Sequence, residues 1–360
     1  MKGYRGIILI ALAMAVSATA TANSRDQAQR IHNRLAGVPA DAATLTEMAQ
    51  LIDNNQVAEA AELAMDNPAF YNVTIKQFAT PWTNEAQDVF APLNDYTATI
   101  IGVVRDDVDF RRILYSDLLY VGNASPAASP SSNAHYQALE DQHADLSTVL
   151  TESSQASQYG TPAEAVAGVL TTRAAANAFF YAGTNRAMLR FTLMNHMCRD
   201  LEQVKDTTRP SDRIRQDVSR SPGGDSRIFR NSCIGCHSGM DPLAQAFAYY
   251  DWEGEQEGNG GRMVYNSGND AETGTRVQGK YLINSNNFPW GYITPDNSWD
   301  NYWRKGPNAN LGWDPNLPGS GEGAASMGKE LAHSEVFATC QAEKVFQTVC
   351  LRKPADGPDT

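Results

Sequence analysis

The sequence predicts a mostly α-helical fold, in which a helical N-terminal region precedes a C-terminal module with long irregular loops. Apolar residues recur at helical spacing through much of the chain before residue 201. Five of the six tryptophans fall between residues 252 and 313, among Gly, Pro, Asn and Asp and without periodicity. With 360 residues, the chain is long enough for two or three compact units. We expect a signal peptide at 1–22, a helical N-terminal domain at 23–122, a linker or loop region at 123–155, a helical region at 156–225 and the C-terminal module at 226–352.

The N-terminus has the pattern of a secretory signal peptide. Lys2 and Arg5 precede an apolar run at 6–16, and small residues follow up to Ala22, where we expect cleavage. The apolar run is too short to span a bilayer, and no later run approaches 18 residues. The sequence therefore predicts a periplasmic or secreted chain with no transmembrane segment in its mature form.

The charge of the chain limits its partners. Removal of Lys2 and Arg5 with the signal peptide takes the formal charge from −12 to −14. Such an acidic chain is a poor ligand for nucleic acid or anionic lipid. We expect instead a protein partner with a basic docking face.

The helical regions follow from their apolar spacing. Residues 45–52 and 57–64 both have helical periodicity, and Asp53-Asn54-Asn55 interrupts it, which predicts a helical hairpin. Residues 123–134 are too poor in large apolar side chains to pack and predict a loop. Helical spacing returns at 162–201, and a closing helix is expected at about 324–351.

The most informative segment is Cys233-Ile234-Gly235-Cys236-His237. At this spacing two thiols can bond to the vinyl groups of a haem while the adjacent imidazole reaches the iron. Cys233 and Cys236 are then the haem anchors, and His237 is the proximal ligand. A thioredoxin-like redox pair lacks a surrounding βαβ pattern, and a zinc site lacks further cysteines at short spacing, so both alternatives are disfavoured.

The sixth ligand of such a haem would decide its chemistry. Met240 follows His237 on the same helical turn, so it lies on the proximal side and is excluded. Met327 is the favoured candidate because it precedes the closing helix. The alternatives are Met263, His196, His333 or a vacant position.

Six arginines lie between residues 209 and 230 of an otherwise acidic chain. A solvated helix face explains such a run in most proteins. A guanidinium also binds a carboxylate through two parallel hydrogen bonds. Arg227 and Arg230 are closest to the motif and are therefore candidates for binding the haem propionates.

Three cysteines lie outside the motif. Cys340 and Cys350 are ten residues apart, or about 15 Å on a continuous helix, which is too far for a disulfide. Pairing of Cys198 with Cys340 is therefore favoured, and an oxidising compartment permits it. The fate of Cys350 stays open.

The segment Cys233 to Tyr250 resembles the haem module of large secreted proteins that are abundant in planctomycetes, with the pattern C-x-x-C-H-x-x-M-D-P-x-G. Met240-Asp241-Pro242 match this pattern in order, whereas Ala244 replaces the usual Gly. The helix that ends in Cys198 and the segment 331–340 also resemble that family, although its proline-rich stretch after the upstream Cys is missing here. The resemblance implies a single-haem cytochrome c-like module fused to helical regions, and it supports the Cys198–Cys340 pairing.

These observations together predict an exported single-haem c-type cytochrome that transfers electrons between periplasmic redox partners. A haem peroxidase or oxidase with an open distal site is the first alternative. The second is a scaffold or binding protein in which the haem staples a small module.

Overall fold

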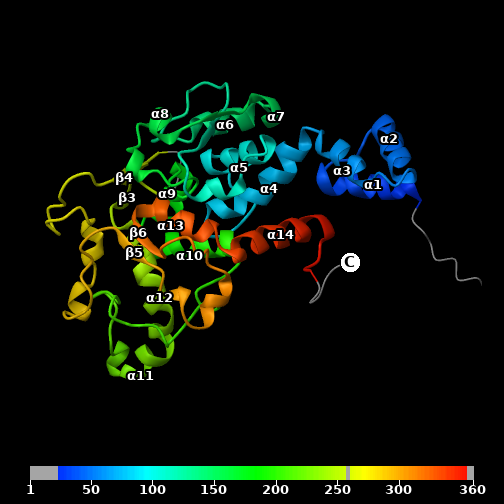
Figure 1. The fold of residues 1–360 in the computed structure, drawn as a ribbon. Helices are drawn as coiled ribbons and strands as arrows, with labels where there is room; N and C mark the ends of the chain where they lie inside the picture. Colours follow the sequence, from blue (N-terminus) through cyan, green and yellow to red (C-terminus); the bar gives the residue numbers. More distant parts are fainter. Residues whose placement is uncertain (1–22, 257–259, 355–360) are drawn as a thin grey trace, which may run out of the picture. The chain divides into compact units, whose positions relative to one another are not determined.

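The computed structural model describes residues 23–256 and 260–354, and these residues are mostly α-helical (Figure 1). The predicted signal peptide, 1–22, lies outside the described residues. The chain divides into two compact units, with the boundary between Phe70 and Tyr71. Each unit is described by itself.

The described residues of the first unit, 23–70, contain three α-helices. These are α1 (Ser24–Leu35), α2 (Ala42–Asp53) and α3 (Val57–Met65). Asp41 caps α2, because its carboxylate accepts hydrogen bonds from the amides of Ala43 and Thr44. Helices α2 and α3 are the hairpin that the apolar spacing predicts. Their buried side chains and one from α1 form the core: Ala28, Leu45, Met48, Ala60 and Ala64.

The second unit is built around α5 (Asp95–Arg105), whose residues 95–103 are all buried. A helix that is buried on every side needs apolar or hydrogen-bonded side chains all round, and the sequence of α5 supplies them. The other helices of this unit are α4 (Lys76–Ala79), α6 (Ala134–Asp141), α7 (Leu146–Val149), α8 (Gln155–Tyr159), α9 (Arg173–Phe179), α10 (Arg186–Met197), α11 (Ser226–Ile228), α12 (Ile234–Ala244), α13 (Gly323–Ala332) and α14 (Glu335–Cys350).

Three short antiparallel strand pairs complete the second unit. They are β1 (Leu119–Val121) with β2 (Thr151–Ser153), β3 (Tyr250–Glu253) with β4 (Arg262–Tyr265), and β5 (Ser298–Asp300) with β6 (Ser320–Glu322). Each pair joins segments that are distant in sequence or flank a loop. The β3–β4 and β5–β6 pairs both lie in the loop-rich stretch between α12 and α13.

Residues 123–155, expected as a linker or loop region, include α6 and α7 in the structure. Large apolar side chains are scarce only up to Ala134. Beyond it, the side chains of Tyr136, Leu139 and Leu146 are buried in the large hydrophobic core of the second unit. That core also contains residues from α5, α10, α12 and α13.

The closing helix is interrupted, contrary to the continuous helix expected over 324–351. Helix α13 ends at Ala332, and α14 begins at Glu335. Ser334 causes the break, because it adopts an extended backbone and its hydroxyl accepts a hydrogen bond from the amide of Phe337. Cys340 and Cys350 both lie on α14, so the separation that disfavours their pairing holds. Among the described residues, no helix combines the length and apolarity needed to cross a membrane.

Candidate functional site

The Cys-x-x-Cys-His motif lies on a nearly continuous helical segment from Ser226 to Ala244. Asp225 caps its start by accepting a hydrogen bond from the amide of Arg227. A π-helical turn, Phe229–Cys233, then leads into α12, which carries Cys236 and His237. A single π-turn within a helical segment is frequently found at functional sites. Cys233 is therefore the last residue of the π-helical turn, and Cys236 and His237 lie in the first turn of α12.

The two thiols face different surroundings. Cys233 packs against an apolar cluster of Ile214, Val218 and Phe229. The Cys236 sulfur lies 3.6 Å from the carbonyl oxygen of Leu201. Both thiols are free and half-buried. Each is therefore available for a covalent bond.

The Cys236 thiol is not activated as a nucleophile. Burial, with a smaller contribution from the Glu202 carboxylate, raises its pKa. A lowered pKa is what activates a thiol as a nucleophile, so Cys236 is not the attacking thiol of a redox pair.

Helix α12 is held by two close contacts. The amide of Asp206 donates a hydrogen bond of 2.8 Å to the carbonyl of Gly235. One turn later, a Cβ atom at Gly239 would lie 2.0 Å from the indole nitrogen of Trp303, so only glycine permits this approach. Trp303 is fully buried. Helix α12 therefore packs directly against the buried indole of Trp303.

His237 is oriented by a buried carboxylate. Its Nδ1 lies 3.1 Å from Oδ1 of Asp241, one turn along α12, and the Asp241 side chain has no exposed surface. Because an ionised carboxylate only accepts hydrogen bonds, Nδ1 must carry the proton. The described residues give Nε2 no hydrogen bond, and about 20 % of the His237 side chain is exposed. This tautomer leaves the Nε2 lone pair free for a metal.

Two arginines stabilise the charge of Asp241. Arg186, at the start of α10, donates to Oδ1 from Nε at 2.7 Å and to Oδ2 from Nη2 at 3.0 Å. The backbone amide of Arg215 also donates to Oδ2, at 3.3 Å. Burial alone raises the pKa of Asp241, but Arg186, Arg215 and the hydrogen bond to His237 together hold it well below the usual range. Asp241 is therefore a permanent carboxylate.

This network was not predicted from the sequence. The four-residue spacing of His237 and Asp241 was visible, since side chains at that spacing lie on one helix face. Arg215 belongs to the arginine run. Arg186 lies 55 positions before Asp241 and carries no local signal.

The two arginines proposed for the propionates lie on the surface. Arg227 is paired with Asp225, with Nη2 and Oδ2 2.7 Å apart, and 82 % of its side chain is exposed. Arg230 is exposed and has no ion pair among the described residues. Within the run from 209 to 230, the buried arginines are Arg213 and Arg215. Of the two candidates, only Arg230 is free to bind another carboxylate without losing an ion pair.

The candidates for the sixth ligand lie in three different environments. Met327, on α13, is fully buried in the large core. His196 is also fully buried, and its Nε2 is 2.7 Å from the hydroxyl of Tyr96. His333 lies against Tyr115, with Nδ1 2.9 Å from the carbonyl of Lys329. In this conformation, one ring nitrogen of each histidine is within hydrogen-bond distance of another group of the protein.

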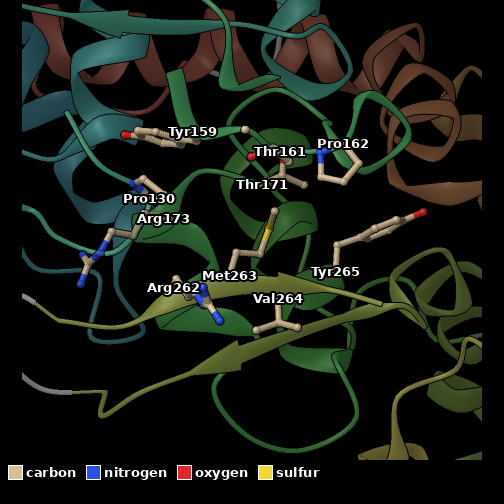
Figure 2. Close-up of a pocket in the computed structure, with 11 residues that line it drawn as sticks. Pro130, Tyr159, Thr161, Pro162, Thr171, Arg173, Arg262, Met263, Val264 and Tyr265 are labelled. Carbon is tan, nitrogen blue, oxygen red and sulfur yellow. The ribbon is translucent and has the colours of Figure 1, made fainter. Parts of the chain in front are cut away.

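Met263 projects from β4 into a pocket of about 290 Å³ (Figure 2). The figure shows its thioether below Thr161 and Thr171, with Arg173 to one side and Tyr265 to the other. The described residues that line this pocket come from 130–173 and 262–265, and none belongs to α12. In the conformation observed, the Met263 side chain therefore lines this pocket.

Cys198 and Cys340 form a disulfide, with a sulfur–sulfur distance of 2.16 Å. Cys198 follows α10 in a left-handed conformation, and Cys340 lies on α14. The bond therefore joins the end of α10 to α14, and these two helices are in contact. Cys350 is free and exposed near the end of α14.

The motif residues thus offer two free thiols and one oriented imidazole on a single helix, which is the donor set that a covalently bound haem uses. Within the described part of the chain, no group of three or more His, Cys, Asp and Glu side chains is arranged to hold a metal ion. No protein-family model, curated protein or solved structure matches this chain.

Proposed function

We propose that this chain is an exported single-haem c-type cytochrome that transfers electrons between redox partners. Cys233 and Cys236 would hold the haem through thioether bonds, and His237 would bind its iron. One observation carries the proposal. The imidazole that follows the two free thiols is already in the tautomer that an iron ligand needs, because Asp241 accepts the Nδ1 proton.

The chain's own residues support a carrier in two further ways. Helix α12 is packed against Trp303 and residue 206, so His237 is held on a rigid element, and a rigid site changes little between oxidation states. When bound, the haem supplies the one-electron chemistry. The acidic chain would attract a partner with a basic docking face.

The first experiment asks whether haem is attached. The protein exported with a cytochrome c maturation system should have the mass of the polypeptide plus one haem, and an alkaline pyridine spectrum typical of two thioether bonds. Cys233→Ser with Cys236→Ser should abolish the covalent haem. Cys350→Ser, which removes the third free and exposed thiol, should retain it. An unmodified mass with both motif thiols free contradicts the proposal.

A haem peroxidase or oxidase is the second candidate, and the His237–Asp241 contact favours it. A carboxylate on Nδ1 makes the imidazole a more basic ligand and stabilises the ferric state. Visible spectra with cyanide or carbon monoxide separate the two functions. A low-spin haem indifferent to both ligands supports the carrier, whereas a high-spin ferric haem that binds them readily supports the enzyme.

A further inference from the structure

The carboxylate behind His237 belongs to a larger buried ion network. Arg186 is placed between Asp241 on α12 and Asp217 in the loop before α11. Its Nη1 lies 2.5 Å from Oδ2 of Asp217, and its Nη2 lies 2.9 Å from Oδ1. Only 7 % of the Asp217 side chain is exposed. One guanidinium thus joins two buried carboxylates, each through two hydrogen bonds.

Without the two carboxylates, the positive charge of Arg186 would be unfavourable at its position in the fold. It is the first residue of α10, where the helix dipole is unfavourable for a cation. Burial lowers the pKa of a guanidinium, but Asp241 and Asp217 outweigh that effect and raise the pKa of Arg186. Arg186 therefore stays charged, and the carboxylates determine its orientation.

We propose that Arg186 is a positioning residue that sets the reduction potential of the haem through Asp241. This inference rests on the proposed function. A carboxylate that accepts the Nδ1 proton increases the electron density on Nε2 and so stabilises the ferric state. A guanidinium on both oxygens of that carboxylate withdraws charge from the hydrogen bond and limits this effect. The potential would therefore depend on the balance between Arg186 and Asp241.

Arg215 acts on Asp241 through its charge, which also lowers the pKa of that carboxyl, but not through a side-chain hydrogen bond. Only its backbone amide reaches Asp241. Its guanidinium is directed to Thr184, with Nη2 2.7 Å from the hydroxyl, and its Nε is 4.0 Å from the nearest Asp217 oxygen. Arg186 is the only described residue whose side-chain cation forms hydrogen bonds with the Asp241 carboxylate.

The test is a double-mutant cycle on the haem-loaded protein, with the reduction potential measured by spectroelectrochemistry. Asp241→Asn should raise the potential, because a neutral amide makes the imidazole less basic. Arg186→Gln should lower it, because the carboxylate loses both guanidinium hydrogen bonds and the positive charge of Arg186. In the Asp241→Asn background, Arg186→Gln should have less than half of its effect in the wild type, since it acts through a group that is no longer there.

Two further variants serve as controls. Arg186→Lys keeps the charge, so its reduction potential should lie between those of the wild type and Arg186→Gln. This variant also provides a test if Arg186→Gln folds poorly. Arg190→Gln should leave the potential unchanged. Arg190 is on the same helix and forms an equally short pair with Asp200, at 2.7 Å, but on the surface.

The outcomes separate this inference from the proposed function. A wild-type protein without covalent haem overturns both. A haem protein in which Arg186→Gln has the same effect in both backgrounds shows only a direct field on the haem, and overturns the inference alone. Shifts of the same sign for Asp241→Asn and Arg186→Gln also overturn it.

Discussion

The two ends of α10 bury positive charge in opposite ways. At the first end, Arg186 is bound by two carboxylates, and its pKa is raised. At the other end, Lys344 of α14 reaches the carbonyl of Asn195 and lies 4.3 Å from the ring centre of Trp82. No carboxylate pairs with Lys344 among the described residues, and burial lowers its pKa to about 7.

Ion pairs therefore hold the Arg186 end of α10 to its neighbours, whereas a disulfide holds the other end. Arg186 and three charged side chains near it, Asp217, Asp241 and Arg215, connect α10 to α12 and to the loop before α11. Around Lys344, the charge contributes nothing comparable, and the Cys198–Cys340 disulfide joins α10 to α14. Fully buried His196 lies at this end, with its Nδ1 lacking a hydrogen bond. We therefore expect replacement of the cation by a neutral side chain to destabilise the protein at the Arg186 end and to stabilise it at the Lys344 end.

The largest effect is expected for Arg186→Met. This change leaves Asp241 and Asp217 buried without their main partner, which costs about 3 to 5 kcal/mol. The free energy of unfolding of the haem-loaded protein, from denaturant titration, measures it. Arg190→Met removes a partly exposed pair on the same helix and should cost about 0 to 1 kcal/mol. Equal losses in the free energy of unfolding for the two variants would show that the Arg186 network stabilises the protein no more than a surface ion pair does.

The motif could be predicted from sequence because its residues are contiguous, so their geometry follows from one helical turn. The partners of Asp241 could not. Arg186 meets Asp241 only after α10 and α12 pack, and the sequence contains no signal for that packing. Arg215 attracted attention as part of a charge run, yet it is the backbone amide that reaches Asp241. Spacing rules describe local contacts, whereas this network is tertiary.

The fold shows the same limit. Helical spacing predicted the mostly α class, because burial of one face imposes its period on the sequence. The break before α14 was missed, although Ser334 is a helix-capping residue. Apolar residues continue on both sides of it, so periodicity alone did not separate α13 from α14. The π-turn before Ile234 has no sequence signal that we can identify.

The second largest effect concerns the disulfide. Replacement of both Cys198 and Cys340 by Ser should destabilise the protein by about 2 to 5 kcal/mol, because the bond closes a long loop in the unfolded chain. Thermal unfolding without reductant measures the loss. Cys350→Ser is the control, since its thiol is free and exposed, and it should change stability by less than about 0.5 kcal/mol. An equally stable double variant would mean that other contacts hold α10 to α14.

The smallest effect has the opposite sign. Lys344→Met keeps the length of the side chain and removes a buried charge, so it should stabilise the protein by about 0.5 to 2 kcal/mol at neutral pH. The gain should depend on pH. The folded pKa of about 7 lies below the unfolded value near 10.4, so the unfolded state binds more protons between these values. The stability of the wild type therefore rises with pH in this window, relative to the methionine variant.

The advantage of Lys344→Met should accordingly be fully present below about pH 7 and decline as the pH rises from 7 toward about 10. Unfolding titrations of both proteins at several pH values measure it. Lys305→Met, at an exposed position, should show neither the gain nor the pH dependence. A destabilised Lys344→Met variant would mean that the contacts with Trp82 and the carbonyl of Asn195 outweigh the cost of burial. The two ends of α10 would then both depend on their cations.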